Sequence, residues 1–123
     1  MKRDDVLGAW ELVSFVSVDA EGTESHPQGP DARGFILYTA DGFMSAQIMN
    51  PGRVGVGGYL TYAGPYRFDE ASATMYHEAE LALWNSWRGS TQVRSASLRD
   101  GDLFLTSDAG GTRSTLHWRR PRR

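Results

Sequence analysis

His77 is the side chain best suited to chemistry, because histidine is the residue whose ordinary pKa lies closest to neutral pH. It stands in residues 73–83, where apolar and polar residues alternate. Side chains two positions apart share one face of a strand, so His77 lies with Met75 and Ala79, whereas Glu78 marks the solvent face. An inward His77 could be a catalytic acid or base, a ligand contact, or a structural hydrogen-bonding group.

Other polar side chains are expected on the same interior surface. In residues 59–69 one face carries Tyr62 and Tyr66, and in residues 90–99 one face carries Gln92 and Arg94. A buried arginine is unfavourable unless it meets a partner, so Arg94 could bind a carboxylate or enolate oxygen, neutralise a buried acid or pack at a rim. The tyrosines could equally fill the interior. The predicted ligand-binding residues are Tyr38, Gln47, Tyr62, Tyr66, His77, Gln92 and Arg94.

Several other kinds of site are excluded by what the sequence lacks. It has no cysteine, and His26, His77 and His117 show no metal-ligand spacing, so no metal site is expected. The glycines of residues 51–58 precede no helix and therefore do not form a phosphate-binding loop. We expect neither a metal nor a cofactor.

The elements that position these residues are strands, because apolar alternation repeatedly ends at a turn signal. We expect a long polar loop at 19–33 and a two-residue type I′ hairpin at Asp41-Gly42. In residues 73–83 the alternation also places Leu81 and Leu83 inside. The expected strands span residues 7–18, 34–40, 43–50, 59–69, 73–83, 90–99, 103–107 and 112–120.

These strands follow one another without a crossover helix, so the sheet should be antiparallel. Eight such strands close a barrel that is just wide enough to be filled or to hold one ligand. A two-sheet sandwich is the alternative, but it needs long crossing connections, and only the loop at 19–33 has that length. The sequence thus predicts an all-β, closed, eight-stranded antiparallel up-and-down barrel.

Length and charge limit the remaining possibilities. The 123 residues are expected to form one domain (1–123). The net charge of −2 gives no reason to expect nucleic acid as a partner, and the basic end, which includes Arg122 and Arg123, is interpreted as a solvated tail. No segment has the apolar length of a secretory signal or a membrane span. We therefore expect a cytoplasmic protein with no membrane partner.

Ordered blocks along the chain resemble one known family. Gly8-Ala9-Trp10 resembles the Gly-x-Trp of lipocalins, and Trp118-Arg119-Arg120 supplies the arginine that lies over that tryptophan in those barrels. Further blocks, among them residues 29–34, 37–47, 62–66, 87–94 and 101–105, are similar to the bacterial and fungal lipocalin-like domain family. The resemblance implies a lipocalin-like calycin barrel in which Trp10 and Arg120 close one end.

One departure from that family concerns residues 51–58. Family members usually carry a longer insertion between the third and fourth strands, whereas this segment is short and rich in glycine. If the insertion is a lid, the cavity here is more open, or a partner subunit covers it.

The sequence is compatible with three functions. The first is a barrel that binds one small, largely apolar or aromatic molecule. The second is a cofactor-free enzyme of specialised metabolism, a cyclase, isomerase or dehydratase in which His77 moves a proton and Arg94 stabilises negative charge. The third is an interaction barrel that forms a homodimer through an exposed patch of Trp84 and Trp87, although these two residues could equally gate one mouth of the barrel.

Overall fold

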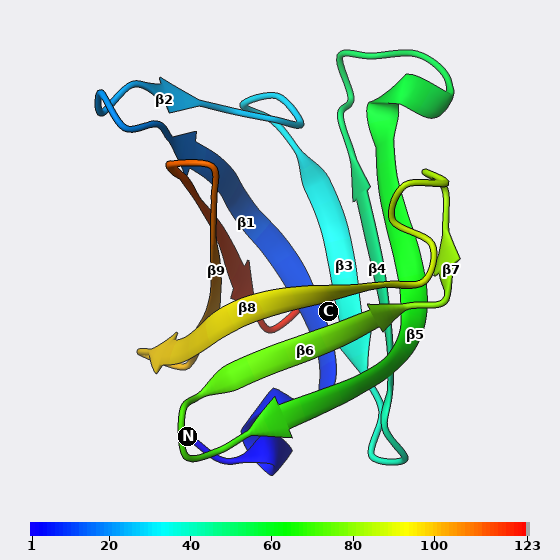
Figure 1. The fold of residues 1–123 in the computed structure, drawn as a ribbon, viewed down its shortest axis with the longest axis vertical. Coiled ribbons are helices and arrows are strands. Elements are labelled where there is room, and N and C mark those ends of the chain that lie inside the picture. The colour runs from blue at the N-terminus through cyan, green and yellow to red at the C-terminus, as the bar shows by residue number, and fades with distance from the viewer. Residues whose placement is uncertain (123) are drawn as a thin grey trace.

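The computed structural model describes residues 1–122, which consist almost entirely of antiparallel strands (Figure 1); Arg123 lies outside the described residues. The short strands β2 (Glu24–Ser25) and β7 (Leu81–Ala82) and the 3-10 helices η1 (Arg3–Val6) and η2 (Val56–Gly58) accompany the longer strands. The longer strands are β1 (Gly8–Val18), β3 (Arg33–Tyr38), β4 (Phe43–Met49), β5 (Tyr59–Asp69), β6 (Thr74–Ala79), β8 (Ser90–Arg99), β9 (Asp102–Ala109) and β10 (Thr112–Arg119).

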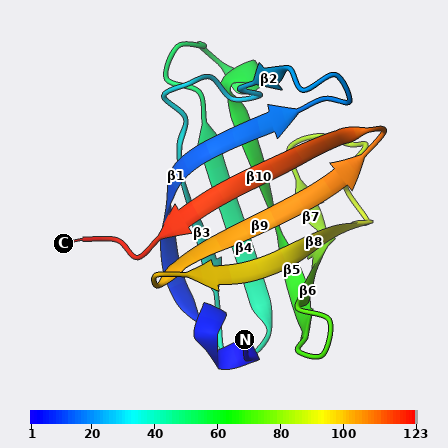
Figure 2. The same cartoon turned by 90° about the vertical axis from the view of Figure 1, so that its left-hand side faces the viewer.

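The sheet closes on itself. The order of paired strands is β10-β9-β8-β6-β5-β4-β3-β1, and an additional pairing joins β10 to β1. In that closing pair Phe15 faces Leu116 and Leu12 faces Trp118. Figure 2 shows β1, β10, β9 and β8 side by side across one wall. Closure leaves neither edge of the sheet unpaired and confirms the predicted eight-stranded antiparallel barrel.

The type I′ turn occurs at a different hairpin from the one predicted. That turn requires positive φ at both central residues. At Asp41-Gly42 only Gly42 has positive φ (97°), so the predicted two-residue turn there is wrong. At Asp100-Gly101 both residues have positive φ, 53° and 83°. Arg99 pairs with Asp102 around them, which makes this the two-residue hairpin.

The expected strand at 73–83 is interrupted. β6 ends at Ala79, the Glu80 backbone N–H donates to the carbonyl of Glu78 over 2.9 Å, and the chain resumes as β7 beside β5. The kink ends the alternation that predicted Leu81 and Leu83 inside. Leu81 is 71% exposed and Leu83 is 38% exposed, so that prediction was wrong.

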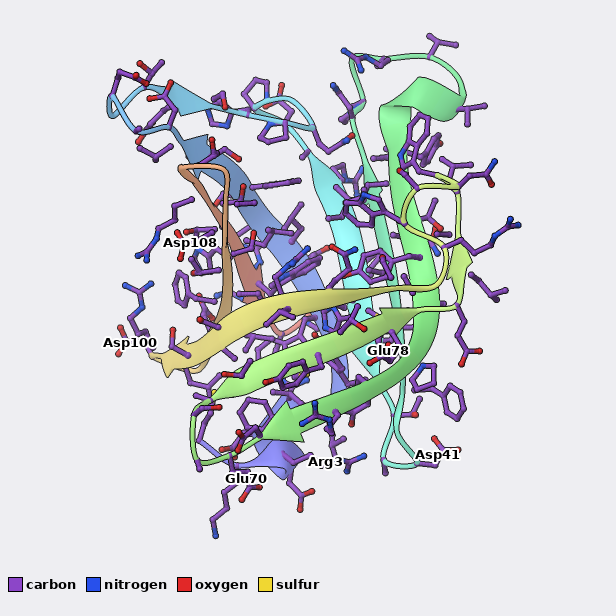
Figure 3. All side chains as sticks on the ribbon, in the orientation of Figure 1. Arg3, Asp41, Glu70, Glu78, Asp100 and Asp108 are labelled. Carbon is purple, nitrogen blue, oxygen red and sulfur yellow. The ribbon has the colours of Figure 1, made fainter. Side chains whose placement is uncertain are left out.

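One end of the barrel is closed by the N-terminal segment. The Trp10 indole N–H donates to the carbonyl of Val6 over 2.9 Å, in a buried contact. The guanidinium carbon of Arg120 lies 3.7 Å from the centre of the Trp10 ring, and its Nη1 and Nη2 donate to the carbonyls of Ala9 and Asp5. At this end the Arg3 backbone N–H also donates to Glu70, and Figure 3 shows both residues there.

Replacing Arg120 tests how much the closed end contributes to the free energy of unfolding. Arg120→Met keeps an apolar stem over the indole but removes the cation–π contact and two hydrogen bonds. We expect the free energy of unfolding to fall by about 1–2 kcal/mol in urea titrations. Arg122→Met is the control, because Arg122 is exposed beyond the last strand, and it should change stability by less than ~0.5 kcal/mol. Equal effects of the two substitutions would show that the stack contributes nothing.

The barrel interior is divided into a filled half and a hollow half. Around η1 it is packed with large buried side chains, including Val6, Trp10, Tyr38, Met75 and Leu103. The loops that hold β2 and η2 lie at the opposite end (Figure 1). Within residues 1–122, no helix has the length and apolarity that a membrane crossing requires.

Candidate functional site

A cavity of about 420 Å³ occupies the hollow half of the barrel. Asp108 and Ala109 are exposed and border it, so the cavity reaches solvent near the turn between β9 and β10. Its apolar walls come from Phe15, Ile36, Ala46, Ile48, Leu60, Leu105 and Leu116, joined by the aromatic residues Tyr62, Trp87 and Trp118. Its main polar groups are His77, Gln92, Arg94, Ser107 and Ser114.

His77 is hydrogen-bonded through both ring nitrogens. It lies on β6 between Tyr66 of β5 and Gln92 of β8 and is 1% exposed. Its Nε2 lies 2.6 Å from the hydroxyl of Tyr38, and its Nδ1 lies 2.7 Å from the hydroxyl of Tyr62. Burial, helped by the positive charge of Arg94, lowers the pKa of His77 to about 3. The imidazole is therefore neutral at physiological pH.

The two tyrosines hold their protons firmly. Burial raises the pKa of Tyr62 to about 12, although Arg94 opposes the shift. Burial likewise raises the pKa of Tyr38 well above its ordinary value. Both hydroxyls and the imidazole consequently form a neutral hydrogen-bonded group, Tyr38–His77–Tyr62, of which His77 and Tyr62 border the cavity.

Arg94 lies on the cavity wall and is held by neutral partners. Its Nη1 donates to the backbone carbonyl of Val93 over 2.9 Å, and its Nη2 donates to Oε1 of Gln92 over 3.2 Å. The Gln92 amide in turn donates to the Ser90 hydroxyl over 2.8 Å. Among residues 1–122, no ion pair joins Arg94 to a carboxylate. The cavity wall therefore carries a positive charge that forms no ion pair with a carboxylate of the described chain.

The other predicted site residues lie in different places. Tyr38 is buried behind His77 and does not border the cavity. Tyr66 lies near the closed end, where its hydroxyl donates to the carbonyl of Thr39 over 2.7 Å and Arg3 stacks 5.1 Å from its ring centre. Four of the predicted residues do come together around the cavity: Tyr62, His77, Gln92 and Arg94.

Gln47 does not lie on the interior surface of the barrel. It was expected inside, but it is exposed on the outer face of β4, because its neighbours Ala46 and Ile48 take the inward positions. β4 carries apolar residues on both faces, including Phe43 on the outer one. Alternation alone therefore gives a weak indication of which face of this strand is buried.

Two tryptophans outside the predicted set of ligand-binding residues border the cavity. Trp87 lies in the connection between β7 and β8, with its ring centre 5.5 Å from that of Tyr62 in an edge-on arrangement. It packs inward, unlike Trp84, which is 43% exposed. Trp118 is 1% exposed, and its indole N–H is buried with no hydrogen-bond partner among the described residues. Alternation in residues 112–120 could have indicated Trp118. The position of Trp87 after the fifth expected strand suggested a gate at a barrel mouth, but no local pattern indicated that its ring packs inward.

No metal centre is found in the part of the chain that the structure describes, since no three histidine, aspartate or glutamate side chains gather there. The hydroxyls, the neutral imidazole and Arg94 can donate or accept hydrogen bonds to an organic molecule but offer no set of ligands for a metal ion.

Comparisons with known proteins agree with this architecture. A family model described as a lipocalin-like domain matches residues 7–58 and 55–120. Among curated proteins, no sequence matches the chain significantly. A solved structure of a redesigned β-barrel is similar at a TM-score of 0.53 with 11% sequence identity, and the match covers 97% of this chain and 94% of that one. At that identity the structural likeness concerns the fold alone.

Proposed function

The chain belongs to the family of lipocalin-like domains, and from that premise we propose that its cavity binds one small, largely apolar or aromatic molecule. The observation that carries the proposal is the cavity of about 420 Å³ inside the barrel. Small-molecule sites in proteins commonly have volumes of roughly 300–1,000 Å³ and combine apolar walls with a few polar groups. Here the walls are aliphatic and aromatic, and the polar groups are His77, Tyr62, Gln92 and Arg94.

The protonation properties of the site favour binding over acid–base catalysis. A general acid or base works best with a pKa near the working pH. The pKa of His77 is lowered to about 3 and that of Tyr62 is raised to about 12, so both move away from neutrality. A group that keeps its protons in place is suited to orienting a ligand. The cyclase, isomerase or dehydratase alternative receives no support from these directions.

Filling the cavity tests the proposal. Ala46 is 2% exposed and borders the void, so the ring of Ala46→Phe should occupy the space that a ligand needs. The probe is N-phenyl-1-naphthylamine, whose fluorescence rises in apolar surroundings. We expect saturable binding by the wild-type protein and at least a roughly tenfold weaker affinity for Ala46→Phe, about 1.4 kcal/mol.

Gln47→Phe is the matched control, because it adds the same ring at the next position of the same strand but on the outer face. It should bind the probe as the wild type does. Circular dichroism establishes that each variant is folded. A wild-type protein without saturable binding, or an unchanged affinity in folded Ala46→Phe, would refute interior binding.

A further inference from the structure

The Tyr38–His77–Tyr62 group has one more hydrogen-bond donor than its internal hydrogen bonds use. A neutral imidazole carries one N–H, and the two phenols carry one O–H each. The group makes two hydrogen bonds, Tyr38 to Nε2 and Tyr62 to Nδ1, and each uses one of the three hydrogens. One phenolic hydrogen therefore remains without an acceptor inside the group.

Burial decides which tyrosine carries that spare hydrogen. Tyr38 is 2% exposed and does not border the cavity, so an unused donor there would be buried without a partner, which is unfavourable. Tyr62 borders the cavity. The better arrangement has the Tyr38 hydroxyl donating to Nε2 and the Nδ1–H donating to the oxygen of Tyr62. The Tyr62 O–H is then free to donate to a molecule in the cavity.

Two further side chains that border the same space carry donors. Trp118 has an indole N–H that is buried and unpartnered among residues 1–122, and an indole can only donate. Arg94 has a guanidinium with five N–H groups, of which the contacts to Val93 and Gln92 use two. No carboxylate of the described chain pairs with it.

Several acceptors near the cavity are already engaged in hydrogen bonds within the protein. The carbonyl oxygen of Gln92 accepts from Arg94. The carboxylate of Asp108 accepts from Nε and Nη2 of Arg113 over 3.0 and 3.2 Å at the exposed rim. The hydroxyl of Ser114 is shared with Ser17 over 2.7 Å. The cavity consequently has spare donors and one unbalanced positive charge, but few free acceptors.

We propose that the molecule bound in this cavity is an apolar acid, with an anionic oxygen such as a carboxylate or enolate held by the guanidinium of Arg94 and the hydroxyl of Tyr62. This assignment rests on the proposed function and specifies its ligand class. The anion balances the charge of Arg94, and charge-assisted hydrogen bonds to it are stronger than neutral ones.

The test uses two ligands of nearly equal shape, 2-naphthoate and 2-naphthamide, which compete with N-phenyl-1-naphthylamine at pH 7.5. We expect the wild-type protein to bind the naphthoate at least about tenfold more tightly than the amide. Arg94→Met should abolish this preference, and Arg94→Lys, which keeps the charge, should retain most of it. Arg99→Met removes the same charge from an exposed position of the same strand and should leave the preference unchanged.

The tyrosines supply a second matched pair. Tyr62→Phe removes the donor that faces the cavity and should weaken naphthoate binding about three- to tenfold. Tyr59→Phe removes a hydroxyl from an exposed position of the same strand and should leave naphthoate affinity within twofold. Urea titrations show whether each variant folds. If a tyrosine variant does not fold, the Arg94 variants still test the proposal.

The outcomes separate the two proposals. If N-phenyl-1-naphthylamine fails to bind the wild-type protein, interior binding itself is wrong. If it binds but the naphthoate and the amide compete equally, or neither competes, the cavity binds ligands without selecting an acid and the assignment made here is overturned. A naphthoate preference that persists in Arg94→Met also overturns it.

Discussion

Lowering the pH from 6.5 to 4.5 is expected to reduce the free energy of unfolding by about 2 kcal/mol through His77 alone. Burial, helped by Arg94, lowers the pKa of this imidazole in the folded protein to about 3, whereas its unfolded value is near 6.5. Between these two values the unfolded chain binds a proton that the folded protein does not. Stability is therefore retained above pH 6.5 and is lost at roughly 1.4 kcal/mol per pH unit until about pH 3.

The structure gives the reason for such a large effect. A protonated His77 would be a cation that is 1% exposed, in a cavity wall that already carries the charge of Arg94. It would also have two N–H donors facing Tyr38 and Tyr62, so both phenols would have to direct their hydrogens elsewhere. Tyr38 has no second partner among the described residues to accept its hydrogen.

Urea titrations at pH 7 and pH 4.5 measure this loss. Carboxylates also titrate in this range, so the informative quantity is the difference between variants. His77→Gln removes the titrating ring but keeps a donor and an acceptor, and it should lose about 2.5 kcal/mol less than the wild type between the two pH values. His26→Gln changes an exposed loop histidine and should behave as the wild type does. Equal acid sensitivity of all three proteins would contradict the prediction.

Gly64→Ala is expected to destabilise the protein by about 3 kcal/mol or more, although it adds a single methyl group. A Cβ atom at Gly64 would lie 1.9 Å from the carbonyl oxygen of Glu78 and 3.1 Å from the backbone nitrogen of Glu80. Both obstacles are backbone atoms, which cannot rotate away as a side chain can. A glycine in a strand often marks such a close approach of another segment of backbone.

The close approach lies where the site is built. Opposite Gly64 the chain leaves β6 and turns through Glu80 into β7, and His77 stands two residues before Ala79, the end of β6. Accommodating the methyl group requires β5 and β6 to separate there. We therefore expect Gly64→Ala also to weaken N-phenyl-1-naphthylamine binding, because the strand that carries His77 is displaced.

Gly57→Ala is the control for this substitution. Gly57 has ordinary negative backbone geometry, and a Cβ there meets only a flexible arginine side chain at 3.6 Å. It should change the free energy of unfolding by less than ~1 kcal/mol in urea titrations. A Gly64→Ala protein as stable as Gly57→Ala would show that the approach of the two strands is not a constraint in solution.

The sequence by itself determined the barrel and much of the inward surface. Apolar alternation and turn residues act over a few positions, so they were readable without tertiary information. They placed Tyr62, His77 and Arg94 on inward faces, and the terminal motifs brought Trp10 and Arg120 to one end, where they stack 3.7 Å apart.

The tertiary structure alone decided how those inward side chains are used. The break after Ala79 depends on backbone from β5, so alternation could not reveal that Leu81 and Leu83 face outward. Gln47 lies outside because packing selected one of two apolar faces of β4. The inward turn of Trp87, the unpartnered N–H of Trp118 and the cavity itself depend on how side chains from distant strands fill a closed volume. That filling is a property of all the strands together, and no local pattern records it.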